Sequence, residues 1–433
     1  MTQKKSKSSK KASAKKSAAR GRTQMIHGKP ATNAWEFSRH LIPPITSATT
    51  FRLDSLERGA QGFMSFAGGS SDAPILIYDR LDEPNTMMLE ESLALMEGTD
   101  CAVTFASGMG AISGAILSCT RQGHKVLAHR TLYGCTYSLL NDWLPRFGIE
   151  TTFIDMNSPE HRQLLDDPKV RVLYFESVSN PTLEIADLPK IMADVERANR
   201  KRKADDRIIV IVDNTFATPW ALRPAEYGVD LVVESLTKNI SGFGTEMGGA
   251  VMGARSFERS LKLARKDFGA ILNPKGAWQI LVHGIPTLAI RYQQQQATAL
   301  KVARWLEKQP RVELVIYPGL TSHPQHALAK KMLRSPEGDF AAGTMISFTL
   351  KGEMRKCQRF VDHVAKHAYS VTLAVSLGVT KTLIEVPGFM THSAIPSEKQ
   401  TSSGIDARAI RLSLGLEHAD DIIADLEAAM AKI

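Results

Sequence analysis

The chain has 433 residues, 43% of them hydrophobic and 23% charged, which is the composition of an ordinary soluble protein. It has room for two or three domains, and no apolar run approaches the ~20 residues that a membrane-spanning helix needs. The net charge of +9 is confined to residues 1–22, which hold nine basic residues and no acid, while the rest of the chain balances 45 basic against 45 acidic residues. We therefore expect no membrane partner and no specific nucleic-acid partner.

Residues 1–22 consist largely of Lys, Ser and Ala, so we expect a disordered basic tail. The segment lacks the apolar core of a secretory signal, although it shares the Ser-rich, acid-poor composition of an organelle transit peptide. It can also touch anionic surfaces without specificity, but a solvated extension is the simpler interpretation. The four cysteines form no Cys-X-X-Cys pair and no metal-binding spacing with histidine, so we expect a reducing, cytoplasmic location and no metal site.

Residues 23–75 contain a Pro-Pro pair and a Gly/Ser-rich stretch. They predict an extended N-terminal arm with little regular structure, which we expect to cross onto another part of an assembly. A helix follows this arm, because Leu89, Leu93 and Met96 share one helical face and Gly98 is suited to end it.

Between residues 76 and 268, short apolar runs alternate with helical stretches such as Gly110–Thr120 and Leu188–Arg200. This alternation predicts an α/β fold with a mainly parallel central sheet, helices on both faces and ligands at the carboxyl ends of the strands. We assign this range to one large domain. The expected strands are Cys101–Phe105, Val126–Ala128, Thr151–Ile154, Val170–Phe175, Ile208–Val212, Leu231–Glu234 and Ala250–Met252.

Residues 269–433 predict a smaller C-terminal α+β domain. Its first part is helical, with Ala299, Val302 and Leu306 on one face. Met345–Leu350 and Arg411–Leu414 then have the composition of strands, and a closing helix follows them.

Lys238 lies directly after the strand that ends near Val233, together with Ser235 and Thr237 and ahead of a flexible Ser-Gly-Phe-Gly run. A lysine that reacts as an amine needs a water-poor site that lowers its pKa, or a carbonyl partner with which it condenses. Small hydroxyl residues beside it are suited to hold a phosphate. The stretch suggests a Schiff-base lysine that carries a phosphorylated aldehyde, and a surface lysine in a turn is the alternative.

Two other strand ends suggest a place for a flat, phosphorylated ligand. Residues 105–111, which include Gly108 and Met109, follow a strand and open a helix, so their free N–H groups can bind an anion. Tyr133 follows the next strand, where its ring can stack on a cofactor and, with a lowered pKa, exchange protons. An ordinary tight turn and a core tyrosine are the respective alternatives.

Asp213 ends the most apolar strand in the chain, where an unpaired carboxylate is costly to bury. A protonated pyridine nitrogen is a suitable partner, and that pairing keeps the ring an electron sink. The alternative is an aspartate that caps the next helix. Asn180 closes another strand and can bind a ring hydroxyl or a carboxylate, although by itself this segment is only a turn.

From about residue 40 to its end, the chain resembles the transsulfuration, or Cys/Met-metabolism, family of pyridoxal-phosphate enzymes, which includes methionine γ-lyases, cystathionine lyases and O-acylhomoserine sulfhydrylases. The resemblance implies the aspartate-aminotransferase-like fold, called fold type I. The matching motifs occur in the family's order and are Tyr78-Asp-Arg80, Ser107-Gly-Met109, Leu132-Tyr-Gly, Glu176-Ser-Val-Ser-Asn-Pro, Asp213-Asn-Thr-Phe, Ser235-Leu-Thr-Lys238 and Arg411-Leu-Ser-Leu-Gly-Leu-Glu.

This resemblance implies that Lys238 attaches pyridoxal 5'-phosphate and moves protons, that Tyr133 stacks on the ring and that Asp213 pairs with the ring nitrogen. Asn180 and Thr215 would lie beside the cofactor hydroxyl. The phosphate would be held by Gly108, Met109, Ser235 and Thr237, and by Tyr78 and Arg80 of a neighbouring subunit. The substrate carboxylate would bind Arg411 and Ser376. The family's usual assembly is a homotetramer built of dimers that share active sites.

The chain departs from the family at three places, one of which is His283, where relatives often carry arginine. Leu81-Asp-Glu-Pro84 replaces the usual Thr-Gly-Asn-Pro, which we expect to add two acids near the entrance of the site. Residues 243–247 read Phe-Gly-Thr-Glu-Met, where many relatives have His-Gly-Asp.

The motifs favour a carbon–sulfur lyase that eliminates a γ- or β-substituent from methionine, cystathionine or homocysteine. Cys135 follows the tyrosine-glycine pair as in methionine γ-lyases, although a buried apolar cysteine is the alternative. Residues 378–382 and 244–249 look more like O-acetyl- or O-succinylhomoserine sulfhydrylases, so γ-replacement, including cystathionine γ-synthesis, remains open. An aminotransferase is less consistent with the Arg411 segment and with Tyr78 and Arg80.

Overall fold

The computed structural model describes residues 21–28, 40–68, 75–159, 161–393, 397–402 and 404–433. The strands are β1 (Cys101–Phe105), β2 (Lys125–His129), β3 (Glu150–Ile154), β4 (Val170–Glu176), β5 (Ile209–Asp213), β6 (Leu231–Glu234), β7 (Gly249–Gly253), β8 (Val312–Ile316), β9 (Met345–Leu350), β10 (Val371–Leu373), β11 (Thr382–Glu385) and β12 (Ile410–Ser413). The helices are α1 (Gly21–His27), α2 (Leu56–Gly68), α3 (Pro84–Glu97), α4 (Gly108–Cys119), α5 (Gly134–Ser138), α6 (His161–Leu164), α7 (Leu188–Asn199), α8 (Thr218–Ala221), α9 (Arg255–Phe268), α10 (Pro274–Gln279), α11 (Ile285–Leu306), α12 (His326–Met332), α13 (Met354–His367), α14 (Ser397–Ser402) and α15 (Ala419–Met430).

A seven-stranded sheet forms the centre of the large domain, in the order β1-β7-β6-β5-β4-β2-β3. The pairs from β6 through β5, β4 and β2 to β3 are parallel, and only β7 runs against its two neighbours. The prediction of a mainly parallel sheet is therefore confirmed, and each of the seven predicted strands lies within a residue or two of its observed bounds. Because six strands, β1 included, run the same way, their carboxyl ends meet along one edge.

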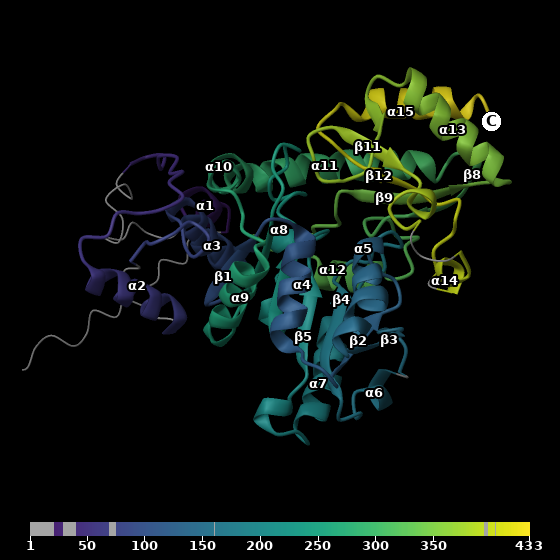
Figure 1. Ribbon diagram of the computed structural model, residues 1–433. Coiled ribbons are helices and arrows are strands. Elements are labelled where there is room, and N and C mark those ends of the chain that lie inside the picture. The colour runs from purple at the N-terminus through teal and green to yellow at the C-terminus, as the bar shows by residue number, and fades with distance from the viewer. Residues whose placement is uncertain (1–20, 29–39, 69–74, 160, 394–396, 403) are drawn as a thin grey trace, which may run out of the picture.

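Both faces of this sheet are buried, as the continuous apolar runs of its strands require. In β5, Ile209 and Ile211 pack with residues of α4, while Val210 and Val212 pack with α3 and α7 on the other face. Figure 1 shows α4 lying over the strands. The period of two along a strand therefore sends alternate side chains into two separate cores.

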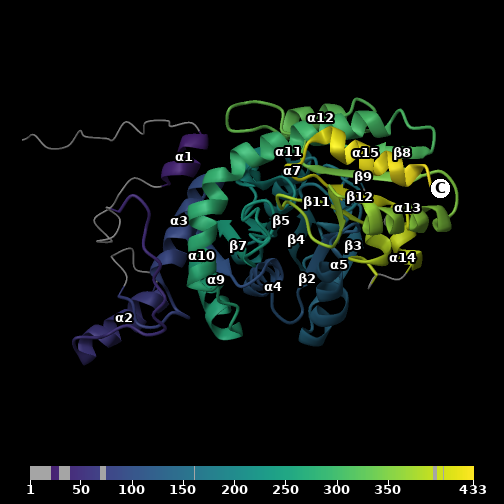
Figure 2. The ribbon, with the colours of Figure 1, turned by 90° about the horizontal axis from the view of Figure 1, so that it is seen from above.

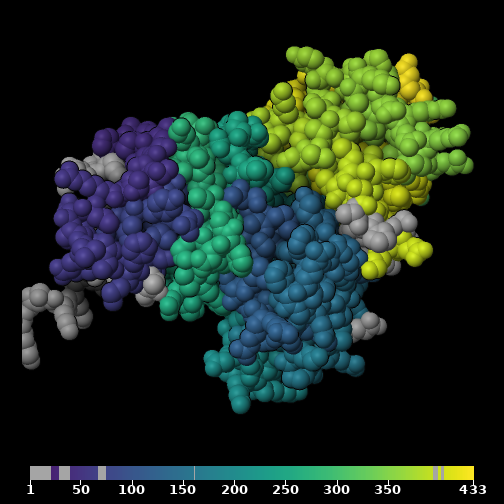
Figure 3. Space-filling model, in the orientation of Figure 1, coloured from purple at the N-terminus to yellow at the C-terminus, as the bar shows by residue number. Residues whose placement is uncertain are grey.

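The C-terminal part contains a second sheet in the order β10-β11-β12-β9-β8, which is antiparallel except between β10 and β11. It forms a separate lobe beside the large domain (Figure 3). Helix α11 joins the two parts, because Leu288 packs in a core of the large domain while Val302 and Leu306 pack with α13 and α15. The packing thus changes from one core to the other inside α11 rather than at residue 269.

The prediction of little regular structure between residues 23 and 75 is wrong for two segments. Helix α1 packs against α3 and α11, with Met25 buried, and α2 packs against α9 at the outer edge of the molecule (Figure 2). Residues 1–20 of the predicted tail lie outside the described residues, whereas Arg22 belongs to the first turn of α1 and forms an ion pair of 3.2 Å with Glu337. Among the described helices, none is both long and apolar enough to cross a membrane.

Glu97, at the end of α3, is fully buried, and one carboxylate oxygen accepts a hydrogen bond of 3.0 Å from the Ala225 N–H. Burial raises the pKa of Glu97 to about 8. Between an unfolded pKa near 4.5 and this folded value, the folded state binds more protons, so the free energy of unfolding falls by up to about 1.4 kcal/mol per pH unit as the pH rises.

Replacing Glu97 with glutamine should remove this pH dependence, since the amide is neutral throughout. We expect the Tm of Glu97→Gln to increase relative to the Tm of the wild type as the pH rises from 5 to 8. Thermal unfolding at three pH values measures this difference. The exposed Glu427→Gln serves as the control. A Tm difference that stays constant with pH would contradict the prediction.

Candidate active site

Polar side chains that follow the strands of the large domain meet in one pocket of about 1170 Å³. Residues of the C-terminal part close it from the other side. Of the predicted cofactor and substrate residues, the pocket is lined by Gly108, Met109, Tyr133, Cys135, Asn180, Asp213, Thr215, Ser235, Thr237, Lys238, Ser376 and Arg411. The structure therefore brings together every predicted site residue except Tyr78 and Arg80.

Lys238 lies in a tight turn after β6, in which its N–H bonds to the Ser235 carbonyl at 3.1 Å. Its Nζ donates a hydrogen bond of 2.9 Å to Ser376 Oγ. Burial lowers the pKa of Lys238, and the nearby Arg411 guanidinium lowers it further. A lysine amine with a lowered pKa is the form that condenses with a carbonyl compound.

Asp213 ends β5, and its side chain reaches solvent only in part. One oxygen accepts a hydrogen bond of 3.0 Å from the Thr215 N–H, and the other receives the Tyr174 hydroxyl at 3.4 Å. Burial raises the pKa of this carboxyl group. A cationic ring nitrogen in the pocket would offset that effect and keep the carboxylate ionised.

The amino end of α4 forms the predicted anion turn. Ser107 caps the helix, with its Oγ accepting the Gly110 N–H at 3.0 Å, which leaves the first N–H groups of the helix for a ligand. A Cβ on Gly108 would lie 2.8 Å from the Cβ of Ser235. Glycine is thus required here because the two loops approach closely.

Two predicted ligands already bind the backbone of this loop. The Thr237 hydroxyl donates to the Gly248 carbonyl at 3.2 Å and accepts the Gly248 N–H at 3.0 Å. Thr215 Oγ1 accepts the Ser235 N–H at 2.9 Å. Both threonines therefore hold the Lys238 loop in place, and contact with a cofactor remains a prediction for them.

Tyr133 occupies the pocket beside Cys135, whose Sγ lies 3.4 Å from the tyrosine hydroxyl. The expectation of a lowered pKa is wrong in sign, because burial and the Cys135 thiol raise the pKa of Tyr133. The side chain is therefore a neutral phenol that can donate a proton. Cys135 is exposed, so the alternative of a buried apolar cysteine does not apply.

Arg411 binds the two halves of the site together. Its guanidinium donates to Asn180 Oδ1 and to the Ser376 carbonyl, both at 2.9 Å, and pairs with Glu385 at 2.9 Å. Ser376 has a backbone φ of 88°, which is strained for a residue with a side chain. Such a constellation can orient a substrate carboxylate.

Sequence reasoning missed two carboxylates and assigned them no role. Glu176 accepts the N–H groups of Tyr133 and Asn180, both at 2.7 Å, and burial raises the pKa of Glu176 to about 8. Glu385 is buried against Arg411. The sequence does contain a feature that could have indicated these carboxylates, namely an acidic residue at the end of an apolar strand. The Thr-Leu-Ile-Glu run of β11 is an example.

Tyr78 and Arg80 do not line the pocket of their own chain. The Arg80 guanidinium lies over the Tyr78 ring at 5.3 Å and donates to the Lys266 carbonyl at 3.3 Å. Tyr78 is 42% exposed, so its ring is available to another molecule.

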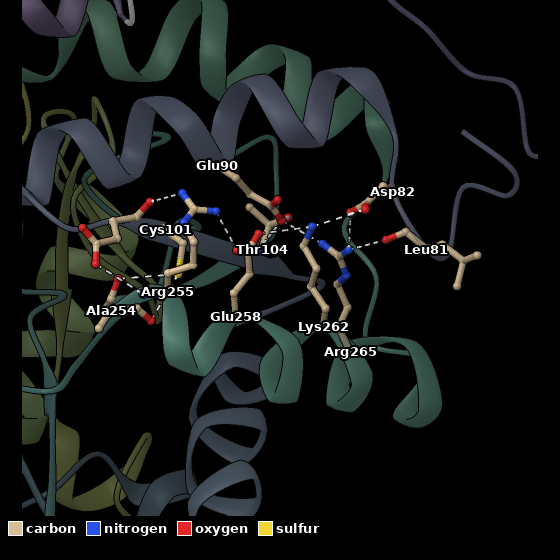
Figure 4. A network of polar contacts seen from close by, with 12 residues as sticks. Leu81, Asp82, Glu90, Cys101, Thr104, Ala254, Arg255, Glu258, Lys262 and Arg265 are labelled. Atoms are coloured by element: carbon tan, nitrogen blue, oxygen red, sulfur yellow. Dashed lines mark hydrogen bonds and ion pairs between the residues drawn. The ribbon is translucent and has the colours of Figure 1, made fainter. Parts of the chain in front are cut away.

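Against the expectation drawn from the sequence, the acids of the Leu81-Asp-Glu-Pro84 segment do not line the pocket of their own chain and bind other groups instead. Asp82 pairs with Arg265 at 3.0 Å and with Lys262 at 3.2 Å, in the network that joins α9 to α3 in Figure 4. Glu83 caps α3 and accepts the N–H groups of its first turn. These acids stabilise the fold around the segment that carries Tyr78 and Arg80.

The residues present fit pyridoxal 5'-phosphate. A buried lysine with a lowered pKa, a carboxylate at the end of the neighbouring strand β5 and a glycine-containing turn with free N–H groups match its aldehyde, ring nitrogen and phosphate.

Comparisons with known proteins agree with this geometry. The model of the family described as Cys/Met metabolism PLP-dependent enzyme matches residues 22–431. The L-methionine gamma-lyase of Porphyromonas gingivalis is 39% identical over 407 residues, which cover 94% of this chain and 95% of the relative. The O-acetyl-L-homoserine sulfhydrylase of Leptospira meyeri is 33% identical over 400 residues, covering 82% of this chain and 86% of the relative.

Among solved structures, a Campylobacter jejuni protein described as an O-acetylhomoserine (thiol)-lyase superposes with a TM-score of 0.84 at 31% identity, covering 95% of this chain and all of the other. That structure carries N'-pyridoxyl-lysine-5'-monophosphate. Since the family model and these relatives span nearly the whole chain, the chain belongs to the Cys/Met metabolism family of pyridoxal-phosphate-dependent enzymes.

Proposed function

We propose that the enzyme is a carbon–sulfur lyase that eliminates the sulfur substituent of a sulfur amino acid, with methionine favoured over cystathionine and homocysteine. The reaction on methionine consumes one water and breaks the Cγ–S bond, giving 2-oxobutanoate, methanethiol and ammonia. When bound, the cofactor acidifies the hydrogen on the substrate α-carbon and stores the resulting charge.

The observation that supports this proposal is the distribution of charged and uncharged side chains along the pocket lining. Among the described residues that line it, acidic and basic side chains are confined to Glu176, Asp213, Lys238 and Arg411, all of which belong to the cofactor or carboxylate end. The remaining lining carries no charge and combines apolar side chains, such as Leu139, Trp143, Met247, Val375, Leu377 and Met390, with the hydroxyl groups of Ser113, Ser138, Thr391 and Ser393. A neutral thioether suits such an uncharged wall, whereas the second charged end of cystathionine would find no charged partner among these residues.

The chain's own residues supply the other requirements of elimination. Arg411 and Ser376 would orient the substrate carboxylate, and Lys238 Nζ would carry protons between substrate carbons. Tyr133, kept neutral by its raised pKa, can donate a proton to the departing sulfur, and Cys135 lies beside its hydroxyl.

The second candidate is an O-acetyl- or O-succinylhomoserine sulfhydrylase, which the relative from Leptospira meyeri and the segments at 244–249 and 378–382 favour. One product assay separates the candidates. The purified enzyme is incubated with methionine, with cystathionine, and with each homoserine ester plus sulfide. Release of 2-oxobutanoate and methanethiol from methionine supports the lyase, while homocysteine formed only with an ester and sulfide would overturn it.

We further propose a homotetramer of dimers that share active sites, located in the cytoplasm. The arm leaves Leu56, Phe63 and Met64 exposed, which is unfavourable for an isolated chain. Tyr78 and Arg80 lie outside the pocket of their own chain, as a contribution to a neighbour's site requires.

Mixing two inactive variants tests the shared site. We expect Arg80→Ala and Lys238→Ala each to be inactive alone, and their co-refolded mixture to recover part of the wild-type kcat. Recovery follows because a mixed dimer holds one site with both an intact Lys238 and a partner's intact Arg80. A mixture as inactive as its components, with mixed oligomers demonstrated by native mass spectrometry, would show that the two residues serve the same subunit.

A further inference from the structure

Arg291 on α11 is a buried cation with an unusual set of partners. It is 4% exposed, and no carboxylate among the described residues lies within ion-pair distance of its guanidinium. Its Nη1 donates to the Asn239 carbonyl at 2.8 Å, and its Nη2 donates to the Ile240 and Gly284 carbonyls at 3.2 and 2.9 Å. Burying a cation without a counter-charge is costly, so the reason to keep it must lie in the groups that it holds.

Two of the three carbonyls belong to the residues that follow Lys238, whereas the third, at Gly284, and the Thr287 hydroxyl belong to the start of α11. The Gly242 N–H bonds to the Lys238 carbonyl at 2.8 Å, while the next two carbonyls, at Asn239 and Ile240, receive Arg291 instead of a backbone donor. Gly242 has a φ of 76°, and a Cβ there would lie 2.0 Å from Arg291 Nη1. The turn is therefore shaped around the guanidinium, whose planar fork can reach several acceptors at once.

Gln295 lies one helical turn further along α11, on the same face as Arg291. It is 1% exposed, and its Nε2 donates to the Val379 carbonyl at 2.9 Å. Val379 belongs to the segment that begins at Ser376, the residue whose hydroxyl accepts Lys238 Nζ.

The two held segments also touch each other. A Cβ on Gly378 would lie 2.6 Å from the Asn239 nitrogen, and a Cβ on Gly244 would lie 3.3 Å from Val379 Cγ1. Both glycines have positive φ, so each is suited to this close approach.

We propose that Arg291 and Gln295 are positioning residues that fix the distance between the Lys238 amine and Ser376. Arg291 holds the turn of the large domain and Gln295 holds the segment of the C-terminal part, so α11 sets the spacing across the boundary between them. The proposal deepens the proposed function, because it rests on Lys238 as the attachment point of the cofactor.

The test compares Arg291→Met, Gln295→Met and the double variant, each as the cofactor-loaded enzyme. Arg304→Met and Gln294→Met are matched controls, since they make the same changes on exposed faces of the same helix. Arg291→Lys keeps the charge but offers donors from a single nitrogen, so it should fall between the wild type and Arg291→Met. The measurements are kcat and KM, Tm, and the pH midpoint of the visible absorption of the bound cofactor.

We expect each single variant to lose about 10- to 100-fold in kcat, since a misplacement of roughly 1 Å costs on that order, with KM changed less than about threefold. The pH midpoint should move by at least about half a unit, because the surroundings of the Lys238 nitrogen change. The kcat of the double variant should be no lower than that of the less active single variant, because both substitutions relax the same distance between Lys238 and Ser376. The two controls should match the wild type in kcat and in the pH midpoint.

A purely structural role predicts a lower Tm with kcat and the midpoint unchanged, and that result would overturn the proposal. So would losses that multiply fully in the double variant. If Arg291→Met does not fold, the same comparison of two single variants with their double variant is made with Arg291→Lys and Gln295→Met. Failure of the cofactor assignment is a separate result, in which borohydride fixes no cofactor to Lys238 of the wild type, and failure of the lyase proposal is seen in the products that the wild type forms.

Discussion

Replacing Lys238 with alanine should abolish turnover, with a loss in kcat of at least about 10³-fold. The substitution removes both the amine that attaches the cofactor and the group that moves protons between substrate carbons. The pocket should otherwise persist, since the turn is held by the Thr237–Gly248 pair and by Arg291. The measurement is keto-acid release under saturating substrate, together with borohydride treatment and mass spectrometry of the peptide that contains residue 238.

The exposed Lys308→Ala is the matched control and should keep wild-type activity. In the wild type, the reduced cofactor should be found on Lys238. Full activity in Lys238→Ala, or cofactor fixed to a different lysine, would contradict the assignment of the site.

Replacing Asp213 with asparagine is the second large effect that we expect, a fall in kcat of about 10²- to 10³-fold. Removing one partner of a buried ion pair costs about 3–5 kcal/mol, and the neutral amide cannot stabilise a protonated ring nitrogen. The Thr215 N–H and the Tyr174 hydroxyl can still contact the amide side chain, so the fold around β5 should change little. Steady-state kinetics and the visible spectrum of the bound cofactor measure the two consequences.

Asp194→Asn provides a matched control, because Asp194 is a buried carboxylate that pairs with His161 and Arg162 away from the pocket. It should lower Tm and leave kcat close to wild type. If Asp213→Asn keeps its kcat, or only loses stability as Asp194→Asn does, then Asp213 has a structural role and no ring nitrogen is paired with it.

Much of the large domain could be predicted from the sequence because the information is local. Buried parallel strands need continuous apolar runs, and a polar residue after such a run, as at Asp213 or Lys238, must lie where the strand leaves the core. The parallel direction of most strands then brings these residues to one edge. For that reason the sequence predicts the cofactor-binding residues without any knowledge of the contacts between them.

The arm and its acids could not be predicted in the same way. Helix α2 contains Gly59 and Gly62 and packs along α9, so its helical state depends on a contact with a distant segment rather than on its own propensity. The ion pair of Asp82 with Arg265 could not be predicted, because Arg265 lies far away in the sequence and no nearby residue indicates the pair. The sequence alone therefore suggests a position for Asp82 near the entrance of the site. Long-range ion pairs leave no periodic signal.

The sequence by itself determined the fold class, the strand ends and the lysine, aspartate and glycine turn that suit pyridoxal phosphate, because apolar periodicity and residue chemistry are local properties. Only the tertiary structure decided which groups share an environment. It reversed the expected sign of the Tyr133 pKa shift, placed Glu385 against Arg411 and set Arg291 and Gln295 behind the two halves of the site. These outcomes depend on burial and on contacts between distant segments, which arise only when the chain folds.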